Sequence, residues 1–293
     1  MTEDTKTRKP RLKRGDPDSH ELTTRDLGII KAVYTYRMLT TAQVERLFFP
    51  PTKENRKYPA QLCLRRLRYL FDKGYLERTM QPIRIPEGTK PLIYRSTKTG
   101  LALLKEHTGE EYPSRRSEEG SLLTHPDHWI KTNDLRITIE YWASQRGYEV
   151  EWVDEIELRK LHKKHKVVVV PDGFFKLTVP PSPQYEKQRV FRAFVETVLT
   201  QTVASYGRKV EEYNYFFNSR YEDLYQSKSV RVLAITTSNT KALNLKTTTE
   251  AMGGRSRFWF TTVEKSENNN ILDDFIWSMA ASERHHAFTE IAQ

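Results

Sequence analysis

The hydrophobic positions around residue 65 predict an amphipathic helix. Apolar side chains recur there at steps of three and four, the spacing that lines one side of a helix of about four turns. The helix begins near Tyr58 and ends before Gly74, a residue suited to the positive φ that follows many helices. Its buried stripe is predicted to consist of Ala60, Cys63, Leu64, Leu67, Leu70 and Phe71.

The opposite side of this helix is cationic. It carries Gln61, Arg65 and Arg68, flanked by Arg66 and Tyr69. The planar side chains of Arg and Gln match guanine and adenine edges in the major groove, and a cationic helix attracts phosphates. We therefore predict a DNA-recognition helix. The alternative is a surface helix whose basic side is simply solvated.

The neighbouring segments fit a winged helix-turn-helix. Two capping boxes, Thr23 with Asp26 and Thr40 with Gln43, predict two helices before the basic one. The elements predicted after it are a strand at Tyr75–Arg78, a hairpin tip at Pro86–Gly88, a return strand at Leu92–Arg95 and a helix at Thr97–His107. Three helices and a hairpin in this order are typical of winged-helix domains.

The second half of the chain alternates between helical and strand patterns, which predicts an α/β sandwich around a mixed sheet. The apolar run Val167–Val170 is predicted to be a buried central strand. The other predicted strands are 148–153, 173–179, 189–198, 230–236 and 257–263, and the predicted helices are 128–146, 200–218, 240–252 and 271–279.

The positive charge is concentrated at the N-terminal end. The net charge is +10, and the first 107 residues contain 23 Lys and Arg against 12 Asp and Glu, while the remainder contains 25 against 26. The first part is therefore the predicted nucleic-acid binder. We divide the chain into a basic disordered arm at 1–20, a winged helix at 21–107, a linker at 108–122 and an α/β domain at 123–293.

Other bulk properties indicate a cytoplasmic protein. No apolar run approaches the roughly 18 residues of a membrane span, and the N-terminus is charged where a secretory signal needs an apolar segment. The single cysteine, Cys63, excludes an internal disulfide and a cysteine-rich zinc site.

Two carboxylates interrupt the apolar strands of the second half. Asp172 follows the run Val167–Val170, and Glu196 lies inside the next apolar strand. Carboxylates on neighbouring strands can hold a Mg²⁺ ion, which polarises a phosphodiester and activates water. Lys209 shares the inward side of the following helix and can assist them. The alternative is a buried charge network that is stable because it is paired.

The order Pro171-Asp172, Glu196 and a helical Lys209 resembles the PD-(D/E)xK nuclease superfamily. The arrangement as a whole is similar to the plasmid replication-relaxation family, over roughly residues 20–265. The resemblance implies an α+β chain with an N-terminal winged helix-turn-helix and a C-terminal α/β sandwich like a PD-(D/E)xK nuclease core. The family's acidic strand usually reads Glu-x-Asp, but Val198 stands at the second acid. The superfamily's lysine two residues after the Glu is also absent.

Three functions follow as hypotheses. The first is a DNA-binding accessory or initiation protein of a plasmid, phage or integrated element, which needs no cofactor. Its partners would be double-stranded DNA, a second copy of the chain and the element's replication or relaxase proteins. The predicted DNA contacts are Lys57, Gln61, Arg65, Arg66 and Arg68, with Arg84 and Lys90 on the wing.

The second hypothesis is a Mg²⁺- or Mn²⁺-dependent DNA endonuclease, with Asp172 and Glu196 as metal ligands and Lys209 as the third catalytic residue. The third is a transcription repressor whose second domain senses a ligand.

Overall fold

A computed structural model describes residues 13–15, 21–50, 59–81, 90–115 and 123–290. The chain divides into two compact units, Met1–Asn133 and Asp134–Gln293. The chain is of the mixed α+β class, with an antiparallel sheet in the first unit and a mixed sheet in the second. Among the described residues, none of the helices has the length and apolar character that crossing a membrane requires.

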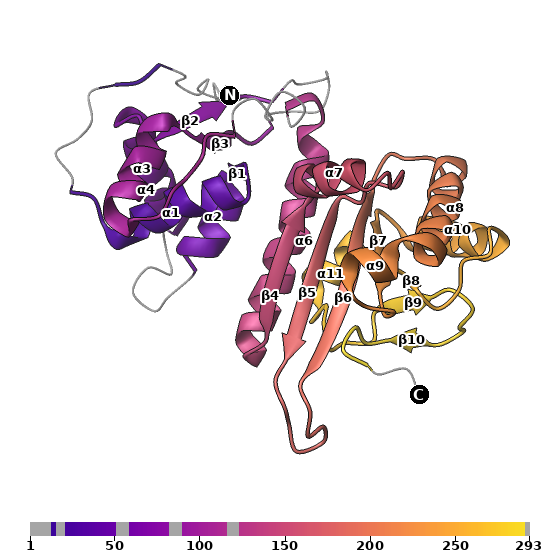
Figure 1. Ribbon diagram of the computed structural model, residues 1–293. Coiled ribbons are helices and arrows are strands. Elements are labelled where there is room, and N and C mark those ends of the chain that lie inside the picture. Colours follow the sequence, from indigo (N-terminus) through magenta and orange to yellow (C-terminus); the bar gives the residue numbers. More distant parts are fainter. Residues whose placement is uncertain (1–12, 16–20, 51–58, 82–89, 116–122, 291–293) are drawn as a thin grey trace, which may run out of the picture. The chain divides into compact units, whose positions relative to one another are not determined.

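The N-terminal unit contains helices packed around a small antiparallel sheet (Figure 1). Its helices are α1 (Thr24–Thr35), α2 (Thr41–Phe48), α3 (Pro59–Asp72) and α4 (Lys98–Thr108), and its strands β1 (Leu39–Thr40), β2 (Leu76–Thr79) and β3 (Ile93–Ser96) are ordered β1-β3-β2. The three predicted helices, the predicted strand pair and the closing helix are thus all present. The hairpin tip Pro86–Gly88 lies outside the described residues.

The helix ends follow the local sequence. Both predicted capping boxes are formed, by Thr23 with Asp26 at α1 and by Thr40 with Gln43 at α2. Gly74 has φ +83°, so the chain leaves α3 through the left-handed conformation that favours glycine.

Two positions of the predicted stripe on α3 are wrong. Cys63, Leu67, Leu70 and Phe71 are buried, but Ala60 is exposed and Leu64 is 50% exposed. The stripe is narrower than predicted because Leu64 lies four residues before the exposed Arg68, on the outward side of the helix.

An ion pair joins α3 to α1. Arg66 donates to both oxygens of Asp26, which is fully buried, and also to the carbonyl of Glu21. Burial alone would raise the pKa of the Asp26 carboxyl, but the hydrogen bonds from Arg66 and Thr23 lower it below its ordinary value. Asp26 therefore serves twice, as the capping acid of α1 and as the anchor of α3.

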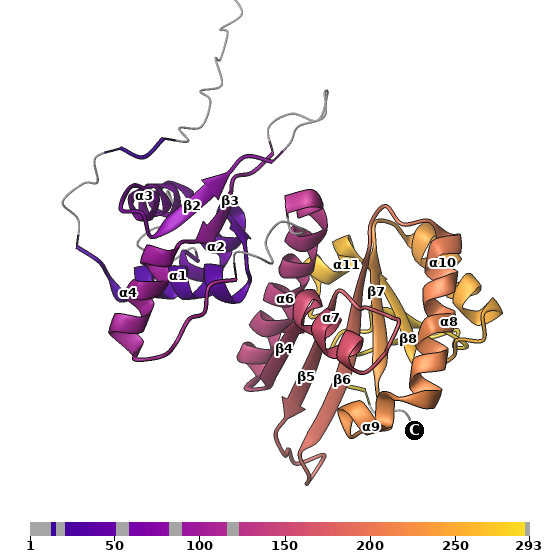
Figure 2. The ribbon, with the colours of Figure 1, turned by 45° about the horizontal axis from the view of Figure 1, so that its top comes forward.

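The C-terminal unit is built on a seven-stranded sheet with helices on both sides (Figure 2). The strands, in the order β10-β9-β8-β7-β6-β5-β4, are β4 (Glu149–Asp154), β5 (Gly173–Val179), β6 (Arg189–Val198), β7 (Arg231–Thr236), β8 (Phe258–Thr262), β9 (Trp277–Met279) and β10 (His285–His286). Strands β6, β7 and β8 are parallel, and the other pairs are antiparallel. This confirms the predicted mixed sheet.

Alternate residues of β6 enter the two layers. Phe194 and Val198 pack with α7 (Glu155–Lys164), α8 (Val203–Ser219) and α10 (Asn239–Ala251), while Ala193 and Val195 pack with α6 (Pro126–Arg146). The short helices α9 (Tyr221–Tyr225) and α11 (Val263–Asn268) connect these elements. Because side chains alternate along a strand, Glu196 points to the layer that contains α8.

Two predicted elements of this unit are wrong. Val167–Val170 forms no strand, and Val168 is 70% exposed, because the segment leaves α7 and reaches β5 as irregular chain. The segment 271–279 is a turn followed by β9, because the Asn270 side chain accepts hydrogen bonds from the amides of Leu272 and Asp273. Helix α7 was not predicted, although Asp154 caps it by accepting from the amide of Glu157.

Because Arg66 is paired with the buried Asp26 and Arg65 is not, replacing these two neighbouring arginines should have very different effects on stability. Arg66→Ala leaves Asp26 buried without its cation, so we expect the free energy of unfolding to fall by about 3 kcal/mol. The exposed neighbour Arg65 provides the control, since Arg65→Ala should change stability by no more than about 0.5 kcal/mol. Urea denaturation of both variants measures this, and equal effects would contradict the anchoring role.

Candidate functional site

The outward side of α3 presents a row of four side chains. Gln61, Leu64, Arg65 and Arg68 are all exposed, and each lies three or four residues from two of the others, so they share one side of the helix. We call these four residues the α3 outer face. Arg65 has no ion-pair partner among the described residues, and Arg68 lies 3.8 Å from Asp72 with 63% of its side chain exposed. The Asp72 side chain is only 6% exposed, but the Arg68 guanidinium at this distance still faces solvent, so both guanidinium groups can meet an anionic ligand.

The other predicted DNA contacts lie elsewhere. The Arg66 guanidinium is held by Asp26 and lies over the Tyr69 ring, 4.5 Å from its centroid. The Lys90 ammonium is 2.8 Å from a carboxylate oxygen of Asp127. Lys57 and Arg84 are outside the described residues.

A hollow of about 470 Å³ adjoins the α3 outer face. The first turn of α1, the end of α2 and one side of α3 line it, and Arg25 and Arg65 both contribute to its walls. A helix N-terminus carries partial positive charge and free amides, which suit a phosphate oxygen. Arg25 was not among the predicted contacts, although its place in the first turn of α1 was a usable signal.

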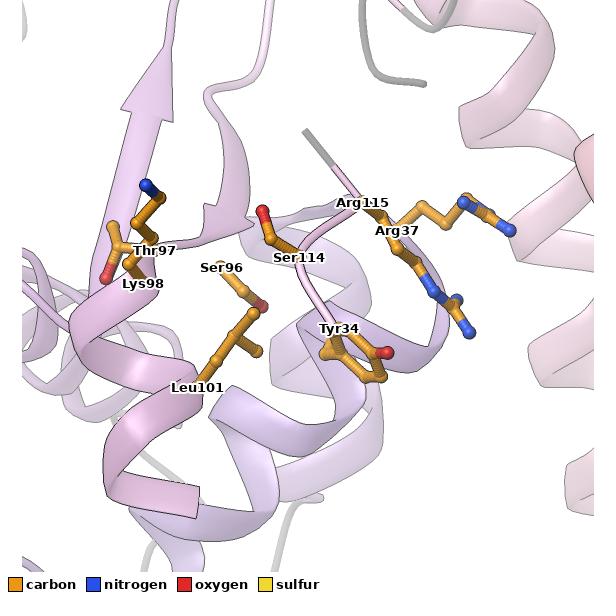
Figure 3. A pocket seen from close by; sticks show the side chains of 8 residues that line it. All are labelled: Tyr34, Arg37, Ser96, Thr97, Lys98, Leu101, Ser114 and Arg115. Carbon is orange, nitrogen blue, oxygen red and sulfur yellow. The ribbon is translucent and has the colours of Figure 1, made fainter. Parts of the chain in front are cut away.

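A second hollow in this unit is much smaller. Figure 3 shows its eight lining residues, which come from α1 and the turn after it, from the end of β3 and the start of α4, and from the segment before residue 116. Its volume is about 20 Å³, close to that of one water position. Arg115 lies over the Tyr34 ring, 4.5 Å from its centroid, so the segment that follows α4 packs back on α1.

In the C-terminal unit the three predicted catalytic residues meet. The Lys209 ammonium on α8 is 2.5 Å from a carboxylate oxygen of Glu196 on β6 and 4.0 Å from one of Asp172, which directly precedes β5. The Glu196 side chain is 1% exposed, and Lys209 and Asp172 are 17% and 11% exposed. We call these three residues the Asp172–Glu196–Lys209 cluster.

Both carboxylates have further hydrogen bonds. Asp172 accepts from the amide of Thr197 at 2.6 Å, and its own amide donates to the carbonyl of Val195 at 3.0 Å. Glu196 accepts from the Tyr213 hydroxyl at 2.5 Å. Gly173 is required beside this cluster, because a Cβ there would lie 2.5 Å from the Trp152 ring.

Burial and neighbouring charges shift the pKa values of Glu196 and Lys209 in opposite directions. Burial raises the pKa of Glu196 to about 7, although the Lys209 charge lowers it. Burial lowers the pKa of Lys209, but the carboxylates of Glu196 and Asp172 more than reverse this and raise it. Lys209 is therefore a stable ammonium, and Glu196 exchanges its proton near neutral pH.

Two tyrosines of α8 complete this region. Tyr213 and Tyr206 are both buried, and burial followed by the nearby Glu196 charge raises the pKa of each hydroxyl. The Tyr206 hydroxyl has no hydrogen-bond partner among the described residues. The spacing of both tyrosines from Lys209, three residues before and four after, was the signal that they share its side of the helix.

The replication-relaxation family model matches residues 30–232, which includes most of the N-terminal unit and the whole Asp172–Glu196–Lys209 cluster. The chain belongs to the replication-relaxation family. Membership suggests a role in the replication or relaxation of a plasmid or other mobile element. No curated protein and no solved structure matches the chain.

In the cluster of this replication-relaxation protein a lysine lies beside the two acids. The Lys209 ammonium is in contact with Glu196 and within 4.0 Å of Asp172. The position two residues after Glu196 is Val198, which is fully buried and offers no ligand atom. The cluster thus offers two acids beside one lysine, and Glu155 at the start of α7 adds a third carboxylate, with an oxygen within 4.8 Å of one of Asp172.

The raised pKa of Glu196 predicts a pH dependence of stability. The folded protein keeps this proton up to about pH 7, whereas an unfolded glutamate loses it near its ordinary pKa of 4.5. Because the folded state binds more protons in this window, the free energy of unfolding should fall as pH rises from about 4.5 to 7. Glu196→Gln removes this contribution, of up to about 3 kcal/mol.

Urea denaturation at several pH values, for wild type and variant, measures this contribution as a difference. The exposed Glu211 of the same helix serves as the control, since Glu211→Gln should follow the wild-type curve. Wild-type and Glu196→Gln curves that run parallel from pH 4.5 to 7 would show that burial does not raise this pKa.

Proposed function

We propose that this replication-relaxation protein is a DNA-binding accessory or initiation protein of a plasmid or other mobile element. The observation that carries the proposal is the α3 outer face, where Gln61, Arg65 and Arg68 project from one side of a helix that follows two shorter helices. Arg and Gln forks at this spacing match base edges in a major groove. Leu64, exposed between them, suits a thymine methyl group.

The rest of the N-terminal unit supports a winged-helix mode of binding. Helices α1 to α3 precede the antiparallel pair β2 and β3, which would form the wing. The first turn of α1 and Arg25 lie beside Arg65 and would contact the phosphates that flank the recognition helix. Double-stranded DNA is accordingly the proposed ligand, bound by a homodimer to paired half-sites.

For the C-terminal unit we propose a PD-(D/E)xK-like core that serves assembly. Asp172 and Glu196 lie on neighbouring strands and Lys209 on the next helix, in the order that the resemblance implies. The ammonium beside the two acids favours a structural role, because it supplies positive charge there without a metal. Such a domain would hold the replication or relaxase proteins of the same element, and DNA binding would need no cofactor.

One observation favours the endonuclease as a second candidate. The buried Tyr206 hydroxyl lacks a partner among the described residues and lies near the two carboxylates whose charges affect its pKa. A bound water or substrate oxygen would satisfy it. For the repressor hypothesis, the hollow of Figure 3 offers no ligand site, because it has room for little more than one water molecule.

The recognition role of α3 predicts a loss of sequence-specific binding. Arg65→Ala and Arg68→Ala should each weaken specific duplex binding by about 1–3 kcal/mol, because a base-edge contact is lost. A mobility-shift titration with the element's own origin DNA measures this. Lys105→Ala, at an exposed lysine on α4, is the control and should leave the affinity unchanged. Wild-type affinity in both arginine variants would remove the recognition-helix assignment.

The state of the cluster predicts that the protein shifts DNA without cutting it. Supercoiled plasmid carrying the origin is incubated with the protein and either Mn²⁺ or EDTA, and one gel records both mobility shift and strand breakage. We expect a shift with intact DNA under both conditions. Nicking that requires Mn²⁺, disappears in Asp172→Ala and persists in Asp223→Ala, a control at an exposed acid, would establish the endonuclease instead.

A further inference from the structure

A second cationic surface lies in the C-terminal unit, although that part of the sequence carries almost no net charge. The eight residues from Arg159 to Lys166 contain five Lys and Arg and no acid. Lys163, Lys164 and Lys166 are exposed, and none of them forms an ion pair with another residue that the structure describes. This end of α7 therefore offers charge that the protein itself does not neutralise.

The backbone at Lys166 is unusual for a lysine. Its φ is +57°, and the position directly follows the last turn of α7, where glycine adopts this conformation at the lowest cost. The amide of Val167 donates back to the carbonyl of His162 at 2.9 Å, so the chain turns sharply here. The turn directs the Lys166 side chain into the wall of a groove.

The groove runs between this segment and α8 and has a volume of about 470 Å³. This lies within the range of about 300–1,000 Å³ that small-molecule sites occupy. Phe216 forms its buried floor, and Val168 and Tyr215 line it while remaining 70% and 71% exposed. Lys166 and Arg220 supply cations at its walls. Helices α7 and α8 can be followed in Figure 2.

We infer that this groove and the lysines at the adjoining end of α7 bind an unpaired DNA strand. A base would stack on Tyr215 in the groove, and the phosphates would contact Lys166 at its wall and Lys163 and Lys164 beside it. Proteins bind single strands by combining a cationic groove with exposed aromatic rings, and stacking on one ring contributes about 1–3 kcal/mol. The carboxylates of Glu211 and Glu212 also line the groove and repel phosphate. They favour a base there, because they can accept hydrogen bonds from exocyclic amino groups.

The inference rests on the proposed function and adds to it. A DNA-binding protein that acts in replication or relaxation works where duplexes open, and a site for the separated strand in the second unit would hold it. The α3 outer face would read the duplex, while the Tyr215 groove would bind the unpaired strand without sequence preference.

The test is fluorescence anisotropy with a labelled single-stranded 20-mer and, separately, with the origin duplex. Tyr215→Ala should weaken single-strand binding about tenfold or more, and Tyr215→Phe should retain it because the ring remains. Tyr141, 50% exposed on α6, gives the control, so Tyr141→Ala should bind as wild type does. A 2-aminopurine base in the oligonucleotide should be quenched on binding only where a ring occupies position 215.

The lysines are tested by salt dependence. Replacing Lys163, Lys164 and Lys166 with Gln should lower the slope of log affinity against log salt by about two, since each phosphate contact contributes about 0.7 for a single strand. The matched control replaces the exposed Lys105, Lys187 and Lys228 with Gln and should keep the wild-type slope.

The outcomes separate the two proposals. Single-strand binding that survives Arg65→Ala and Arg68→Ala but is lost in Tyr215→Ala supports the inference, even if the duplex is not bound and the proposed function fails. Wild-type protein that binds the duplex but not the 20-mer overturns the inference alone. Single-strand affinity that is lost in the arginine variants and unchanged in Tyr215→Ala also overturns it, because the strand would then bind the N-terminal unit.

Discussion

A carboxylate in the middle of the large sheet determines how the C-terminal unit is put together. Glu196 is almost fully buried on β6, and an ionised group in such a place costs several kcal/mol unless it is paired and hydrogen-bonded. Both of its partners, Lys209 and Tyr213, come from α8, one helical turn apart. The helix can therefore not slide or rotate on the sheet without leaving the acid unpaired. The polar contacts thus fix the position of α8 on the sheet, and the aromatic residues around Phe194 pack in that arrangement.

The N-terminal unit uses the same principle. Asp26 is buried at the start of α1, and its cation comes from α3. This pairing removes Arg66 from the outer face and holds it against the protein, while Arg65 and Arg68 stay outside. In both units a buried acid selects one cation of a neighbouring helix. The pairing thus divides the basic residues of each helix into those that build the fold and those that can meet a ligand.

The parts of the fold that adjacent residues determine could be predicted from the sequence, and the parts that depend on tertiary context could not. The capping boxes at Thr23 and Thr40 and the left-handed Gly74 were read correctly, because a few adjacent residues determine them. The apolar run Val167–Val170 was misread, since hydrophobicity alone cannot distinguish a central strand from an irregular segment. The error at 271–279 has the same origin, because the side chain of Asn270 forms a turn that periodicity does not reveal.

The same distinction applies to the candidate sites: the side of an element on which a residue lies could be predicted, but its partner in the fold could not. Strand alternation and helix periodicity were enough to bring Asp172, Glu196 and Lys209 together, because each rule states which side of an element a residue occupies. Neither rule states which partner a side chain finds across the fold. The role of Arg66 as an anchor and that of Tyr213 as a donor were therefore missed, since both depend on pairings between elements distant in sequence.

The contacts of Asp172 have a consequence for reading related sequences. Its carboxylate accepts from the backbone of Thr197, and its amide donates to Val195, so this one residue ties the start of β5 to β6 on both sides of the acid. An aspartate here is useful to the sheet whether or not any bond is ever cut. Relatives that have lost cleavage would still be selected to keep it. The acid at position 172 is therefore a poor diagnostic of nuclease activity, because the sheet uses it in either case.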